Sequence, residues 1–136
     1  RWNHGMAKID EHRMIIVGGL DEDNNVLSSG FIYDVRTQQS TPLRNDMPVA
    51  LYGCYVVAND EYAYVLGGFG GGYIGGSTDF GGAVTTVYRL CLKTQEWTIM
   101  APMGSAREDF GVALKDNYIY VFDRSLSSSE RYSIEN

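Results

Sequence analysis

The chain has 136 residues, of which 44% are hydrophobic and 12% are aromatic, so it is long and apolar enough to fold as one domain. Its formal net charge of −6 argues against nucleic acid and anionic membranes as partners, because both require clustered lysines and arginines. Ten tyrosines, sixteen glycines and only three prolines favour strands joined by tight turns over helices.

The first part of the chain predicts four antiparallel strands. A polar turn at Asp10–His12 separates the first two strands, and the second strand stops at the glycine pair Gly18–Gly19. The predicted strands are Gly5–Ile9, Arg13–Val17, Gly30–Val35 and Ser40–Leu43.

The rest of the chain predicts the same order of strands and turns. The strands predicted in the middle part are Gly53–Ala58, Tyr62–Leu66, Thr85–Leu92 and Glu96–Met100. Those predicted in the last part are Gly111–Leu114, Tyr118–Phe122 and Glu130–Ile134. No segment shows the 3.6-residue apolar period of an amphipathic helix, so we expect an all-β protein.

These parts form an internal repeat. The glycine pair recurs as Gly67–Gly68, 49 residues later (67 minus 18), and an inner glycine recurs as Gly5, Gly53 and Gly111. Since several features keep one order at one period, we divide the chain into repeats of residues 1–45, 46–103 and 104–136.

A four-stranded unit with a period near 50 residues resembles the kelch repeat, whose blades build β-propellers. The resemblance covers the whole chain. The residues that carry it, for which we expect packing roles, are the glycine pairs Gly18, Gly19 and Gly67, Gly68, the tyrosines Tyr33, Tyr88 and Tyr132, which we take as equivalent positions of the three copies, and Trp97. Ser40 or Thr41 takes the place of the tryptophan in the first copy, and Phe122–Asp123 takes the place of the glycine pair in the third.

Propellers close with ~4–8 blades, whereas this chain holds about three copies, so the resemblance implies an incomplete propeller. Two interpretations follow. Either further blades of a longer propeller cover the open ends, or copies of the chain self-associate to close the ring.

The insertion Phe69–Ala83 is rich in glycine but lacks the lysine and the following helix of a phosphate-binding loop. We therefore interpret it as a loop that joins two strands of a blade. Its apolar residues Tyr73, Ile74 and Phe80 are candidates for contact with a protein partner.

The resemblance adds a second group of candidate partner residues. In kelch-like propellers, polar residues at the start of each innermost strand face the central pocket, and Asn3 with His4, Leu51 with Tyr52, and Asp109 with Phe110 match these places. Of these we select Asn3 and Asp109, together with Arg107 just upstream, as partner-binding candidates. Arg107 and Asp109 can equally pair within a local salt-bridge cluster.

The sequence predicts no catalytic residue, metal site or cofactor. His4 and His12 are the only histidines, and they lack the spacing of a ligand set. Cys54 and Cys91 lie in predicted strands, where buried thiols act as small apolar groups, and two thiols favour a reducing, cytoplasmic setting.

The resemblance implies a protein-interaction module, such as a ubiquitin-ligase substrate adaptor or a scaffold. The alternative is a segment of a propeller-based enzyme, such as a sugar isomerase or a copper-radical oxidase.

Overall fold

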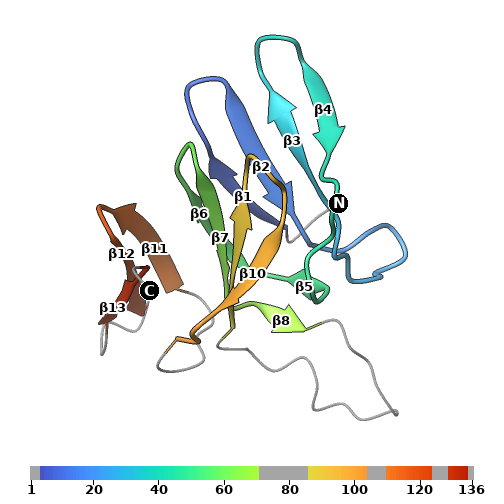
Figure 1. Cartoon of the computed structure of the whole chain (residues 1–136). Coiled ribbons are helices and arrows are strands. Elements are labelled where there is room, and N and C mark those ends of the chain that lie inside the picture. The colour runs from blue at the N-terminus through green and yellow to red at the C-terminus, as the bar shows by residue number, and fades with distance from the viewer. Residues whose placement is uncertain (1–3, 71–85, 104–109, 124–128, 135–136) are drawn as a thin grey trace.

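The computed structural model describes residues 4–70, 86–103, 110–123 and 129–134, and these form three antiparallel sheets that lie side by side (Figure 1). The first sheet has the strand order β1-β2-β3-β4. Its strands are β1 (Gly5–Lys8), β2 (Arg13–Val17), β3 (Gly30–Asp34) and β4 (Gln39–Pro42).

The second sheet has four strands in the order β10-β9-β7-β6, and the third has the order β11-β12-β13. The strands of the second sheet are β6 (Tyr55–Ala58), β7 (Tyr62–Leu66), β9 (Val87–Cys91) and β10 (Trp97–Met100). Those of the third are β11 (Phe110–Lys115), β12 (Tyr118–Asp123) and β13 (Ser129–Ser133). The predicted all-β architecture of four-stranded, kelch-type blades in an open array is confirmed.

A short strand pair lies outside the three sheets. β5 (Leu51–Tyr52) pairs with β8 (Phe69–Gly70), so the insertion that the sequence assigned to a loop from residue 69 begins with a strand.

The described part of the chain holds no helix of the length and hydropathy that would cross a lipid bilayer.

Side-chain oxygens fix the hairpin turns of the first two sheets. The Asp10 carboxylate accepts hydrogen bonds from the amides of His12 and Arg13 at 2.9 and 2.8 Å. Asn59 accepts hydrogen bonds from the amides of Glu61 and Tyr62 in the same way, at 2.8 Å each. These Asx turns explain why a polar residue precedes the apolar runs of β2 and β7.

The sheets stack through alternating side chains. We call the face of a sheet that points toward the next sheet along the chain its forward face, and the opposite face its rear face. Ile15 and Val17 on the forward face of the first sheet pack against the rear face of the second, which presents Ala63 and Val65. The innermost strand β6 contacts both β1 and β11.

The second junction repeats this arrangement one sheet further on. Tyr64 and Leu66 on the forward face of the second sheet pack against Ile119 and Val121 on the rear face of the third. All of these side chains are nearly inaccessible to water, so each junction is a small hydrophobic core.

The strand register corrects the alignment of the repeats at three positions: Tyr88, Gly53 and Phe122. Tyr33 lies opposite Met14 and Tyr132 opposite Ile119, which are matching positions, but Tyr88 lies opposite Val65, two residues away from the match. Leu90 takes the matching place in the second sheet, opposite Ala63.

The register also separates Gly53 from the other two inner glycines. Gly5 and Gly111 lie opposite Val17 and Phe122, whereas Tyr55 takes that place in the second sheet, opposite Leu66. Phe122 therefore corresponds to Leu66 and stands one residue before the position of the glycine pair.

Candidate interaction surface

The starts of β1, β6 and β11 meet the ends of β2, β7 and β12 at one end of the stack. We call it the glycine-pair end, since Gly18–Gly19 and Gly67–Gly68 lie there beside the β5–β8 strand pair (Figure 1). The hairpin turns at Asp10–His12 and Val35–Gln38 lie at the opposite end.

The glycines of this end permit close approach of the backbone. Gly18 has φ +67°, and a Cβ atom added there would lie 2.4 Å from the carbonyl oxygen of Leu51. Gly68 has φ +88°, and an added Cβ would lie 2.8 Å from the Cα of Cys54. Both distances are too short for any side chain, so only glycine fits at these two positions. The two glycine pairs therefore let the segment Leu51–Cys54, which contains β5, pack directly against the ends of β2 and β7.

An aromatic pair lies on this support. The rings of Tyr52 and Phe69 stack with centroids 5.3 Å apart and an interplanar angle of 23°, and both residues are only partly buried. Leu51 next to them is 1% exposed and anchors the segment in the first core cluster. Rigid aromatic groups on a fixed backbone lose little conformational entropy when a partner binds.

Three hydrogen bonds join the segment after β4 in the first sheet to the outer hairpin, β9 and β10, of the second sheet. The Trp97 indole nitrogen donates a hydrogen bond to the carbonyl oxygen of Asn45 at 3.0 Å. The Gln95 side-chain oxygen accepts a hydrogen bond from the amide of Arg44 at 2.7 Å, and the Asn45 side chain donates to the Gln95 carbonyl at 2.7 Å. The geometry gives Trp97 a polar contact between sheets in addition to its apolar area.

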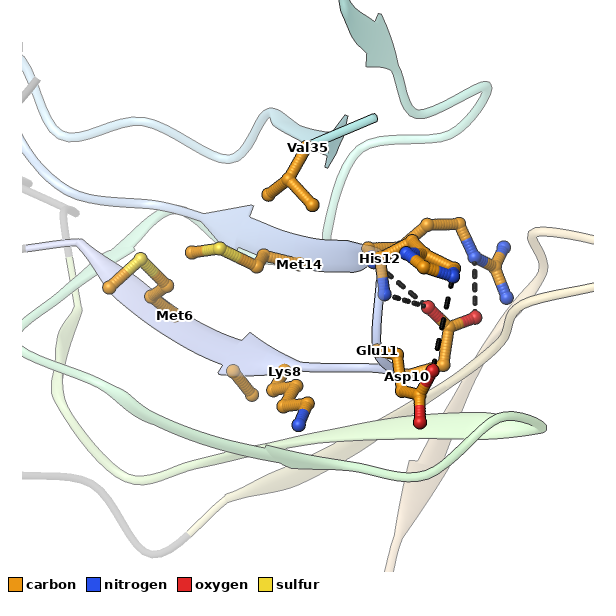
Figure 2. A pocket seen from close by; sticks show the side chains of 9 residues that line it. Met6, Lys8, Asp10, Glu11, His12, Met14 and Val35 are labelled. Carbon is orange, nitrogen blue, oxygen red and sulfur yellow. Dashed lines mark hydrogen bonds and ion pairs between the residues drawn. The ribbon is translucent and has the colours of Figure 1, made fainter. Parts of the chain in front are cut away.

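A hollow of about 320 Å³ lies on the rear face of the first sheet (Figure 2). Met6, Met14 and Val35 form its apolar part, and the ion pair between Asp10 and Arg13, 2.9 Å long, lies at one end. Hydrogen bonds from the His12 amide and from the Arg13 side chain lower the pKa of Asp10 from 3.8 to about 2.

Neither cysteine lies in a cluster of metal-ligating residues among the parts that the structure describes. Both are free thiols. Burial raises the pKa of Cys54 to about 11, which keeps that thiol neutral and unreactive. Hydrogen bonds from the side chain and the amide of Thr94 lower the pKa of Cys91.

The six partner-binding candidates chosen from sequence all fall outside the described residues: Asn3, Tyr73, Ile74, Phe80, Arg107 and Asp109. Their neighbours along the chain are described. His4 precedes β1, Phe69–Gly70 is the first, described part of the insertion, and Phe110 opens β11.

Sequence reasoning matched Tyr52 to the start of an innermost strand but missed its stacking partner Phe69. The available signal was the aromatic residue directly after the glycine pair Gly67–Gly68, at the place where the first copy has Leu20.

Comparison with known proteins identifies the architecture. The model of the kelch motif matches residues 9–47 and 50–104, which is more than half of the chain. The chain belongs to the kelch-repeat family.

Its relatives include several kelch-like proteins. Kelch-like protein 34 of Homo sapiens is 32% identical over 124 residues, which cover 88% of this chain and 18% of the relative. Kelch-like protein 40 of Mus musculus is 33% identical over 132 residues, covering 88% and 19%. Kelch-like protein 21 of Bos taurus is 33% identical over 128 residues, covering 93% and 19%. The chain thus spans about a fifth of the length of these relatives.

Proposed function

We propose that this kelch-repeat chain is a protein–protein interaction module and that its partner binds at the glycine-pair end of the stack. The observation that supports this most is the stacked, partly exposed pair Tyr52–Phe69 on a backbone that close-packed glycines hold in place. Aromatic residues are enriched and charged residues depleted at the centres of protein interfaces.

The composition of this end agrees with that pattern. The segments Leu51–Cys54 and Gly67–Gly70 contain no charged side chain. The candidates Tyr73, Ile74 and Phe80 follow β8 along the chain and would extend the apolar surface. Asn3, Arg107 and Asp109 lie one to three residues before inner strands along the chain and would supply a polar rim, in the arrangement that protein interfaces commonly show.

Site-specific photo-crosslinking in the native cells tests this proposal. A photoreactive phenylalanine analogue in place of Phe69 should capture a discrete protein, and the same analogue at Thr37, on the opposite end of the first sheet, should not. Adding Tyr52→Ser should remove the product at position 69. Equal capture from Thr37, or capture that ignores the Tyr52 substitution, would exclude this end as the partner site.

A narrower role follows from the family resemblance: a ubiquitin-ligase substrate adaptor or a scaffold. If the module is an adaptor, Phe69→Ser should lower ubiquitylation of the captured partner. If it is a scaffold, that substitution should disperse the partner without changing its ubiquitylation. The two free thiols support an intracellular, reducing setting for either role.

A further inference from the structure

The loop between β2 and β3 folds into a small acidic hairpin at the glycine-pair end (Figure 1). A β-bridge closes its base, and the Asp21 amide donates a hydrogen bond to the Asn25 carbonyl oxygen at 3.1 Å. The turn between these two residues carries Glu22 and Asp23, and both of these residues are exposed. We call residues 20–26 the acidic hairpin.

Asp21 shapes the hairpin, whereas the side chains of Glu22 and Asp23 do not. The Asp21 carboxylate accepts hydrogen bonds from the amides of Asp23 and Asn25 at 2.8 and 2.9 Å, and from the Asn25 side chain at 3.1 Å. The bonds from Asn25 lower the pKa of Asp21, so this carboxyl stays ionised at neutral pH. The carboxylates of Glu22 and Asp23 make no hydrogen bond or ion pair with any described residue, so they can bind other groups.

Backbone hydrogen bonds join the acidic hairpin to the strand that begins the aromatic pair. The Leu27 amide donates to the Gly19 carbonyl oxygen at 2.8 Å, and the Gly19 amide donates to the Leu51 carbonyl oxygen at 2.8 Å. Leu51 directly precedes Tyr52 in β5. Since a chain extends by at most ~3.6 Å per residue, the Cα of Glu22 lies within ~11 Å of the Cα of Gly19. The carboxylates therefore stand at the edge of the aromatic surface.

A fourth carboxylate lies beside the same hairpin. The Ser28 hydroxyl donates a hydrogen bond to the Asp46 carboxylate at 3.4 Å, and the Met47 amide donates to the Ser28 carbonyl oxygen at 2.8 Å. Asp46 is exposed. Acidic residues thus gather beside β5, which itself carries no charged side chain.

The described ion pairs of the chain lie at the hairpin turns of the first sheet. They join Asp10 with Arg13, Asp34 with Arg36 and Glu11 with His12. Among the described residues, Arg44 is the cation nearest to Asp46 along the chain, and it forms no ion pair with Asp46 or with the acidic hairpin. The acidic hairpin and Asp46 therefore present negative charge that no described cation neutralises.

Arginine fits an aromatic surface with carboxylates at its edge. Within this chain the Arg89 guanidinium lies 4.6 Å from the centroid of the Tyr62 ring, an arrangement that cation–π attraction favours. A guanidinium on the Tyr52–Phe69 pair can stack in the same way, and its planar fork of N–H donors remains available to a carboxylate. An acidic segment would instead meet like charge, which opposes binding.

We propose that the partner segment bound at the glycine-pair end is basic and places an arginine on the Tyr52–Phe69 pair, beside the acidic hairpin and Asp46. The inference rests on the proposed function, since it names the chemistry of the partner at that site. The charge of the chain agrees with it, because a formal net charge of −6 attracts basic segments before contact.

Charge reversal in the acidic hairpin tests the proposal with the photo-crosslink at position 69. The double substitution Glu22→Lys and Asp23→Lys should lower the yield of crosslinked partner at least ~10-fold. Asp21 stays unchanged because it holds the turn. Asp60→Lys with Glu61→Lys is the matched control, since it makes the same change of charge at an exposed hairpin turn of the second sheet, and it should leave the yield unchanged.

Two synthetic peptides test the same surface without the partner. The probe Gly-Ser-Arg-Leu-Arg-Ser should shift the amide resonances of Leu51–Gly53 and Gly67–Gly70 in a nuclear magnetic resonance titration of the 136-residue chain. The analogue with glutamate in place of both arginines should not. The shifts should shrink in the double hairpin variant and in about 0.5 M salt, which screens exposed charges. A dispersed amide spectrum of the variant shows that it remains folded.

Failure of this inference is distinguishable from failure of the proposed function. Capture at position 69 that ignores charge reversal, or equal shifts from the glutamate peptide, would overturn the basic partner and leave the glycine-pair end as the partner site. No capture, with no shift from either peptide, would overturn both.

Discussion

Replacing Gly18 with alanine tests the close approach that joins the first sheet to the β5 segment. An alanine at φ +67° costs about 1 to 2 kcal/mol, because its Cβ crowds the backbone in the left-handed region. The added methyl group would also lie 2.4 Å from the Leu51 carbonyl oxygen, which accepts a hydrogen bond from the Gly19 amide at 2.8 Å. Losing that bond costs a further ~1 kcal/mol, so we expect a decrease of about 2 to 3 kcal/mol in the free energy of unfolding.

Gly53→Ala is the matched control for this experiment. Gly53 has nearly the same φ, +64°, but an added Cβ would meet only the ring of Phe69, at 3.2 Å. It should therefore cost only the conformational term of about 1 to 2 kcal/mol. Urea unfolding followed by tryptophan fluorescence measures both values. Equal losses in the two variants would refute a specific role for the contact between Gly18 and Leu51.

Three further predictions concern single residues. Asp10 has its pKa lowered from 3.8 to about 2, chiefly by the His12 amide, so its stabilising effect is present above pH 3.8 and lost as pH falls toward 2. Asp10→Asn should flatten the decline in unfolding free energy over that range, and an unchanged slope would contradict the assignment. Iodoacetamide at pH 8 should alkylate Cys91 well before the buried Cys54, as peptide mass spectrometry would show, whereas equal rates would contradict the burial of Cys54. Trp97→Phe should lower the free energy of unfolding by about 1 kcal/mol through the lost indole hydrogen bond, with no loss of folding.

Much of the fold is predictable because local signals agree with one another. Alternating apolar residues, polar turns such as Asp10–His12 and the glycine pairs each mark the same strand boundaries. The bounds of β2 and β7 are as predicted, and the other predicted strands differ from the observed ones by one or two residues at an end, as at β6, which starts at Tyr55 and not at Gly53. The short strands β5 and β8 were not predicted.

Register was harder to predict because it depends on the turn between strands. Aligning the tyrosines equated Tyr88 with Tyr33. The turn that follows the third strand of each sheet instead equates Leu90 with Tyr33. Gln38 and Gln95 both adopt positive φ, 58° and 60°, at the same point of that turn. The pairs Thr37–Gln38 and Thr94–Gln95 mark the same point of the two turns and were the better guide. Aligning them places Leu90 opposite Ala63, the residue that corresponds to Met14.

The aromatic pair at the glycine-pair end was hidden for a physical reason. Tyr52 and Phe69 are 17 residues apart (69 minus 52), and they meet only because two short strands pair beside the blade. Neither strand is long enough to show a periodic pattern in the sequence.

Amide hydrogen exchange, measured with and without the partner captured by crosslinking, is the most direct test of an interaction module that uses the glycine-pair end. The proposal predicts slower exchange in the partner complex at Leu51–Gly53 and Gly67–Gly70, with no change at the hairpin turns Asp10–His12 and Val35–Gln38. Protection of those turns, with unchanged exchange beside Tyr52 and Phe69, would contradict it.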